Sequence, residues 1–68
     1  MGAWDNAKPI PIPQKPLFRV RDLFDVFLVG RSHVEEMRRS EDTGNVYMRI
    51  RDAKGRERYV LLEENLFG

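Results

Sequence analysis

Residues 45–62, NVYMRIRDAKGRERYVLL, decide the fold, because apolar and charged side chains alternate on both sides of a turn signal. Successive side chains of a strand point to opposite faces, so Val46, Met48 and Ile50 would share one face. The turn signal is residues 52–55, since Asp favours the first position of a type I turn and Gly can close it in the left-handed conformation. We therefore predict a β-hairpin with one apolar face.

The turn also fixes which residues of the two strands face one another. The predicted pairs are Arg51 with Glu57, Ile50 with Arg58, Arg49 with Tyr59, Met48 with Val60, Tyr47 with Leu61 and Val46 with Leu62. In this register the apolar side chains of both strands fall on the same side. Because two strands alone are only marginally stable in water, other elements must cover the apolar side.

Five cationic side chains gather near the tip of this hairpin, although the formal net charge of the whole chain is only +1. They are Arg49, Arg51, Lys54, Arg56 and Arg58. Such a cluster can bind phosphate groups. It can equally keep two exposed strands soluble and block edge-to-edge pairing. The sequence leaves both interpretations open.

The composition indicates one small domain preceded by a proline-rich arm. The chain has 68 residues and no cysteine, which argues against a disulfide framework and against cysteine-ligated zinc. No apolar run is long enough to cross a bilayer, and no signal-peptide pattern is present, so we expect a cytoplasmic protein without a membrane partner. All four prolines lie in residues 1–17, which predicts an extended arm before a domain at residues 18–68.

Residue patterns typical of catalysis are nearly absent. His33 is the only histidine and has no neighbouring pattern that would make it a metal ligand or a general base. Ser32 is better explained as a helix cap than as a nucleophile. We find no Gly-rich phosphate loop or calcium loop. We therefore expect a binding protein with no enzymatic activity, no cofactor and no metal ion.

Residues 21–39 contain the signals for a helix and the main ambiguity of the chain. Ser32 and Glu35 have the spacing of a capping box, and Glu35 with Arg39 forms a favourable i,i+4 pair, which predicts a helix from His33 to about Arg39. The preceding segment, RDLFDVFLV at residues 21–29, fits either a helix or a strand. Its β-branched and aromatic content favours a strand, but periodicity does not decide.

Residues 18–67 resemble the small winged-helix DNA-binding proteins of the phage excisionase and MerR type. The resemblance lies in the apolar positions Val20, Leu23, Val26, Phe27, Val29, Val34 and Met37, in the triplet Arg31-Ser32-His33, in Gly55-Arg56-Glu57-Arg58-Tyr59, and in the acidic turn Glu63-Glu64-Asn65-Leu66. It implies an α+β fold in which a helix-turn-helix precedes a β-hairpin wing. It also implies a sequence-specific excisionase or transcriptional regulator of phage or prophage type.

The resemblance further implies which residues would contact double-stranded DNA. Arg31, Ser32, His33, Glu36 and Arg39 would line a recognition helix in the major groove. Arg49, Arg51, Lys54, Arg56 and Arg58 would place the wing on phosphates or in the minor groove. So small a footprint implies cooperation with a second copy, as a dimer or an array, or with a recombinase or RNA polymerase.

A small SH3-like β-barrel is the alternative fold. Its strands would be residues 18–20, 25–30, 33–39, 45–52 and 56–62, with residues 41–45 closing a second hairpin. Such a barrel would be a protein-interaction module that binds and modulates a larger host protein or a nucleic-acid-processing protein. The capping box favours the winged helix, whereas Phe24 is easier to place in the barrel. On balance the sequence favours the DNA-binding interpretation.

Overall fold

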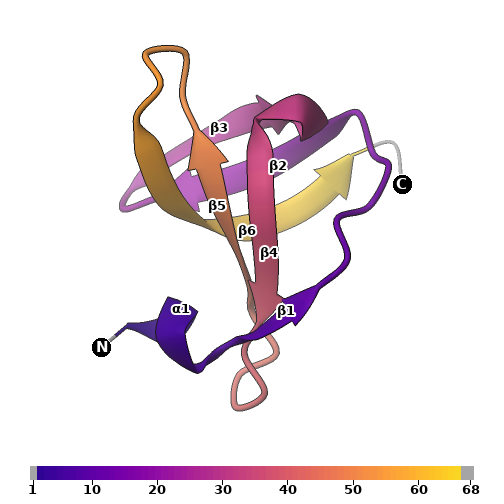
Figure 1. Ribbon diagram of the computed structural model, residues 1–68, viewed down its shortest axis with the longest axis vertical. Helices are drawn as coiled ribbons and strands as arrows, with labels where there is room; N and C mark the ends of the chain where they lie inside the picture. The colour runs from indigo at the N-terminus through magenta and orange to yellow at the C-terminus, as the bar shows by residue number, and fades with distance from the viewer. Residues whose placement is uncertain (1, 67–68) are drawn as a thin grey trace.

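The computed structural model describes residues 2–66, which form a six-stranded antiparallel sheet with little helix (Figure 1). The elements are α1 (Ala3–Asn6), β1 (Lys8–Ile10), β2 (Leu17–Asp22), β3 (Asp25–Gly30), the 3₁₀ turn η1 (Arg31–His33), β4 (Val34–Arg39), β5 (Val46–Arg51) and β6 (Glu57–Leu66). Across the sheet the order is β1-β4-β5-β6-β2-β3. Within residues 2–66 no helix is both long enough and apolar enough to cross a bilayer.

The β5–β6 hairpin confirms the register predicted from its turn. Five of the six predicted pairs form, from Tyr47 opposite Leu61 to Arg51 opposite Glu57, and the pairing ends before Val46 and Leu62. The turn is closed by the Gly55 N–H, which donates to a carbonyl oxygen at 2.9 Å, and Gly55 is in the left-handed region with φ of 80°. The predicted apolar side of this hairpin faces the core, where Met48 and Ile50 are buried.

The predicted helix-turn-helix does not exist in the described residues, so the winged-helix fold class is wrong. The segment predicted as a recognition helix is strand β4, preceded only by the three-residue turn η1. Ser32 lies inside η1, where the cap position is held by Gly30, and no side chain caps this turn. The helix-turn-helix and winged-helix descriptions therefore do not apply to this chain.

A β-bulge explains why β4 has the apolar spacing of a helix. Val34 lies opposite Ile50, but Glu36 lies opposite Arg49, so β4 has one extra residue between these two pairs. The extra residue changes the side to which the following side chains point. Val34 and Met37 are therefore both buried although they are three residues apart. This spacing of three suggested a helix when strand pairing could not be seen.

Residues 21–29, whose structure the sequence left open, form the end of β2, a two-residue turn and most of β3. The pairs run in unbroken register from Leu17 opposite Gly30 to Asp22 opposite Asp25. The strand preference of β-branched and aromatic side chains decides this segment. The five strands of the barrel alternative correspond to β2 through β6, although the last strand continues to Leu66. The chain is thus a small antiparallel β fold.

The sheet folds over one apolar core. In Figure 1 the β2–β3 part of the sheet lies behind β4 and β5, and β6 crosses between them because it pairs with β5 and then with β2. Eight buried side chains form the core, namely Phe18, Val20, Val29, Val34, Met37, Met48, Ile50 and Val60. The proline-rich arm is not extended throughout, because it begins with the helix α1 before it forms strand β1, and its Ile10 and Ile12 pack against this core. β1 adds to the edge of β4.

Candidate functional site

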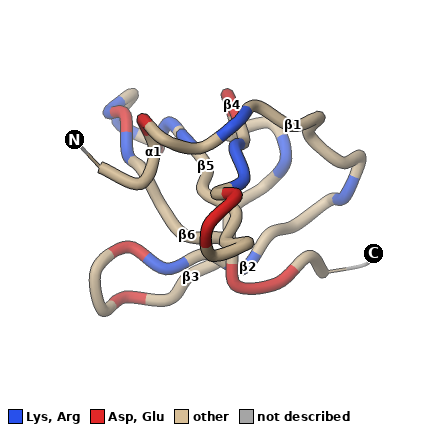
Figure 2. The backbone as a smooth tube through the Cα atoms, turned by 90° about the horizontal axis from the view of Figure 1, so that it is seen from below, with Lys and Arg blue, Asp and Glu red and all other residues tan. Residues whose placement is uncertain are grey.

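The arginines of β5 that were predicted to contact DNA phosphates are paired with carboxylates of neighbouring strands. Arg51 donates from Nε and Nη2 to the two carboxylate oxygens of Glu35, at 3.0 and 3.3 Å. Arg49 Nε lies 3.4 Å from Glu35 Oε1 and 3.5 Å from Glu57 Oε1. Figure 2 shows basic and acidic segments interleaved along the chain. The positive charge of these two residues is therefore largely offset within the molecule.

The remaining cations of the hairpin are divided between paired and free positions. Arg56 Nε donates to Asp52 Oδ2 at 3.0 Å. Arg58 Nη1 donates to Asp22 Oδ2, also at 3.0 Å, and this contact ties β6 to the end of β2. Lys54 is exposed and makes no ion pair with residues 2–66. One unpaired lysine in this turn is a much weaker phosphate site than the five cations in the sequence suggested.

The residues predicted to form a recognition surface do not share one face. They are Arg31, Ser32 and His33 in η1, and Glu36 and Arg39 in β4. Glu36 accepts a hydrogen bond from Arg38 Nε at 2.9 Å. Arg39 lies at the far end of β4, opposite Val46. A strand rises about 3.3 Å per residue, so η1 and Arg39 are roughly 20 Å apart.

His33 serves as a structural contact in the described chain. Its Nδ1 lies 3.1 Å from the carbonyl oxygen of Arg51, and because a carbonyl can only accept, Nδ1 carries the proton. The bond fixes η1 against the end of β5. Among residues 2–66 no three His, Cys, Asp or Glu side chains lie close enough together to hold a metal ion.

Hydrogen bonds lower the pKa of two carboxyl groups beside the β5–β6 turn. The Arg51 guanidinium lowers the pKa of Glu35 below its ordinary value through their hydrogen bond. The backbone N–H of Arg56 is the main cause that lowers the pKa of Asp52, at a hydrogen-bond distance of 2.8 Å. In both cases the hydrogen bonds stabilise the charged carboxylate, so both groups are ionised at neutral pH.

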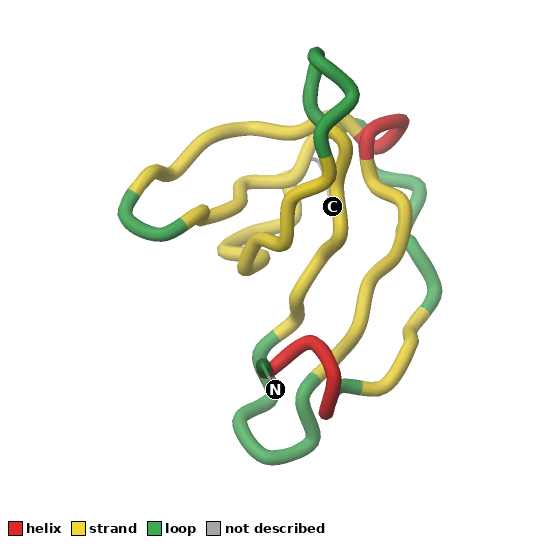
Figure 3. The backbone as a smooth tube through the Cα atoms, turned by 60° about the vertical axis from the view of Figure 1, so that its left-hand side comes forward, coloured by secondary structure: helices red, strands yellow, loops and turns green. Residues whose placement is uncertain are grey.

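The β2–β3 hairpin has an apolar tip that the sequence did not mark as a site. Leu23 and Phe24 form its two-residue turn and are 84% and 95% exposed. Leu23 also has φ of 57°, a left-handed conformation that is unfavourable for a residue with a side chain. In Figure 3 the hairpin extends to the left, away from the rest of the sheet.

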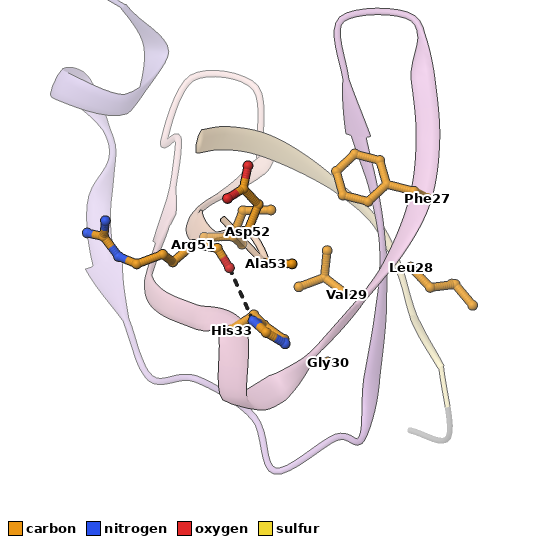
Figure 4. Close-up of a pocket in the computed structure, with 9 residues that line it drawn as sticks. Phe27, Leu28, Val29, Gly30, His33, Arg51, Asp52 and Ala53 are labelled. Carbon is orange, nitrogen blue, oxygen red and sulfur yellow. Dashed lines mark hydrogen bonds between the residues drawn. The ribbon is translucent and has the colours of Figure 1, made fainter. Parts of the chain in front are cut away.

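Strand β3 continues this apolar surface and also borders a hollow. Its outward side chains Val26 and Leu28 are 40% and 54% exposed. Phe27 and Val29 point the other way, into a hollow of about 310 Å³ whose opposite wall includes Ala53 of the β5–β6 turn. Figure 4 shows Phe27 and Val29 directed toward this space, whereas Leu28 points away from it. Strand β3 is therefore apolar on both sides from Val26 to Val29, although Arg19 and Arg21 of β2 lie beside Leu28 and Val26 on the outer side.

A second hollow lies on the outer side of β5 and β6, and its lining includes Trp4, Tyr59 and, from the β2–β3 turn, Leu23. The ring of Trp4 in α1 meets the ring of Tyr59 edge-on, with centroids 5.3 Å apart and planes at 64°. The guanidinium carbon of Arg38 lies 4.3 Å from the centroid of the Trp4 ring. These contacts hold α1 on the sheet, so we regard this aromatic cluster as structural.

One local signal could have identified the exposed tip. Asp22 and Asp25 flank Leu23 and Phe24, and aspartates on both sides of two residues are typical of a turn between strands. A turn is normally exposed, so large apolar residues inside one would stand in water. That inference required choosing the strand interpretation of residues 21–29, which periodicity alone did not support.

Comparison of the chain with protein-family models, with curated proteins and with solved structures found no match.

Proposed function

We propose that this chain is a small protein-interaction module, and that it binds a larger protein by inserting the Leu23–Phe24 tip of the β2–β3 hairpin into an apolar pocket. The proposal rests on one observation, the exposure of two large apolar side chains on a strained turn. Leu23 is in the left-handed region and Phe24 is almost fully exposed. Exposed apolar patches and strained turns are both concentrated at binding sites.

The free energy available at the tip is sufficient to anchor a partner. Complete burial of one Leu or Phe side chain is worth about 1.5–3 kcal/mol, so the two together could contribute about 3–6 kcal/mol. Aromatic side chains that fill a central pocket are typical of the residues that dominate binding energy. The rest of the interface would exclude water around them.

The charges around the tip indicate the chemistry of the pocket. Asp22 and Asp25 face each other at the base of the turn, and Asp25 makes no ion pair with any other described residue. Asp22 is already bonded to Arg58. A pocket with an apolar floor and a basic rim would complement this tip, because a rim charge assists association and orientation.

Two features favour this proposal over the DNA-binding hypothesis. A duplex reader of the predicted type needs a helix in the major groove, and the corresponding residues form β4. Four of the five hairpin cations have carboxylate partners within the chain. The hypothesis of a protein-interaction module requires neither a helix nor free cations.

A site-specific photocrosslinking experiment tests the proposal. A benzophenone amino acid would replace Phe24 in the full chain, and in a control chain it would replace Thr43, which is exposed in the distant loop between β4 and β5. Irradiation in extracts of the source cells should give one discrete adduct from position 24 and none of the same mass from position 43.

Competition links such an adduct to the tip. Excess unlabelled wild-type chain should abolish the adduct, whereas excess Phe24→Ser chain should leave it. Phe24 is 95% exposed, so this variant should fold like the wild type, which circular dichroism verifies. Equal competition by the two chains, or the absence of any adduct from position 24, would disprove the proposal.

A further inference from the structure

Strand β3 is a free sheet edge without the usual protection. It ends the strand order of the described chain and has six residues in unbroken register with β2. Alternate N–H and C=O groups of such a strand point away from its one neighbour and lack strand partners. Natural edges are shortened or carry Lys, Pro or bulges. β3, Asp25–Gly30, has none of these.

The other edge of the sheet provides an internal comparison. β1 has only three residues, Lys8–Ile10, and includes both a lysine and Pro9. It therefore has two of the features that prevent pairing with another chain. The same protein thus protects one edge and leaves the other open, with exposed Val26 and Leu28 beside the open edge.

We propose that two copies of this chain pair along β3, antiparallel, around a two-fold axis that passes through Leu28. Side chains that face each other across an antiparallel pair lie on the same side of the sheet. Neighbouring residues of one strand point to opposite sides, so a residue cannot face its own neighbour in the second copy. The axis must therefore pass through a residue that faces its own equivalent. Phe27 and Leu28 are the two residues at the middle of the strand. A Leu28 axis places Phe27 opposite Val29 of the second copy and Val26 opposite Gly30.

Charge selects the Leu28 register. It places Asp25 opposite Arg31 of the second copy, so that opposite charges meet twice in the dimer. Within one copy neither residue makes an ion pair with the described residues, and Arg31 Nε is buried without a hydrogen-bond partner. Asp25 instead faces Asp22, a like-charge pair that is unfavourable across strands. A Phe27 axis would place Asp25 opposite Val29 and leave these charges unpaired.

The dimer and the tip occupy different sides of the hairpin. The turn at Leu23 and Phe24 curves from β3 toward β2, whereas the second copy would lie on the opposite edge of β3. Self-association therefore leaves the Leu23 and Phe24 side chains free, while Asp25 at the base of the turn would pair with Arg31 of the second copy. The Phe24→Ser variant should dimerise like the wild type, which separates this inference from the proposed function.

Because the chain has no cysteine, disulfide formation can locate the axis. In a Leu28→Cys variant the two new thiols would face each other across the axis, with Cα atoms about 5.5 Å or less apart, which suits a disulfide. In a Val26→Cys control they would be separated by four residues along the strand, about 14 Å. With oxidised glutathione, the first variant should form covalent dimers at least tenfold faster than the second.

Charge reversal tests the register independently of disulfides. Asp25→Arg and Arg31→Asp should each raise the dimer dissociation constant at least tenfold in analytical ultracentrifugation. The double variant should return most of the affinity, because the opposite charges would again face each other. Asp25 is exposed, so its reversal should not disturb the fold.

Three results would overturn the inference. The first is a wild-type chain that stays monomeric up to millimolar concentration. The second is an equal rate of disulfide formation for Leu28→Cys and Val26→Cys, which random collision would produce. The third is a double charge reversal that dissociates as readily as the single ones.

Discussion

Replacing Leu23 by glycine should make this protein more stable, although the change removes an apolar side chain. Leu23 has φ of 57°, and the left-handed conformation costs a residue with a side chain about 1–2 kcal/mol. Glycine adopts it freely and is the usual residue at the first central position of a two-residue hairpin turn with such a φ.

Two smaller effects oppose this gain. Glycine loses more backbone entropy on folding, which costs about 0.5–1 kcal/mol. Leu23 is 84% exposed, so removing its side chain sacrifices only about one-sixth of the burial value of a leucine, below about 0.5 kcal/mol. The expected net gain in the free energy of unfolding is about 0.5 kcal/mol. For a domain of this size that corresponds to a rise in Tm of about 2–4 °C.

The assay is thermal denaturation followed by far-ultraviolet circular dichroism, with urea denaturation for the free energy. Phe24→Gly is the matched control, because Phe24 is even more exposed than Leu23 but does not have a positive φ. Glycine there relieves no strain and should lower the free energy of unfolding by about 0.5–1 kcal/mol. If Leu23→Gly is no more stable than the wild type, or if both glycine variants change stability in the same direction, the strain argument is refuted.

Three further predictions concern the contacts around the sheet. The pKa of Asp52 is lowered in the folded chain, so this carboxylate stabilises the fold above its unfolded-state pKa, and the stabilisation is lost as the pH falls through its folded-state pKa. Acid titration from pH 5 to 2 should therefore destabilise Asp52→Asn less than the wild type. Asp42→Asn is the control, because the Asp42 carboxylate makes no ion pair with residues 2–66. Trp4→Ala removes an aromatic pair and a cation–π contact and should lower the free energy of unfolding by about 1–2 kcal/mol. Trp4→Phe keeps an aromatic ring and should lower it less. If urea denaturation of Trp4→Ala matches that of the wild type, these contacts of α1 contribute no stability. Arg56 and Arg58 are bonded to carboxylates, so the double variant Arg56→Gln, Arg58→Gln should change the affinity for a duplex DNA fragment less than twofold across a salt titration. If the affinity of the double variant depends clearly less on salt than that of the wild type, this hairpin does bind phosphates.

The register of the β5–β6 hairpin could be predicted because its determinants are local. The turn at residues 52–55 fixes the pairing, and strand alternation then places Met48 and Ile50 inside. The structure of β4 could not be predicted in this way. Its buried Val34 and Met37 acquire a helix-like spacing only because a bulge forms against β5. A bulge depends on a partner strand that the local sequence does not identify.

The candidate site was missed for a related reason. The cations were visible as a cluster along the chain, but their partners come from other strands, as with Arg58 and Asp22, which are 36 residues apart. Charge counted along a hairpin therefore overestimated the free charge at its surface. The apolar tip, in contrast, was hidden inside a segment that fitted a helix equally well, where Leu23 would have been a core residue.

The unfavourable features of this fold are concentrated in the β2–β3 hairpin. Its turn places Leu23 in a left-handed conformation, two aspartates face each other at the base of the turn, and its outer edge is long and open. By comparison, the β5–β6 turn uses Gly55 where φ is positive, and the edge strand β1 has Lys8 and Pro9. Departures from local stability rules tend to occur where a protein functions. Because none of the fully buried core side chains belongs to this turn, changes at the tip can alter binding without unfolding the sheet.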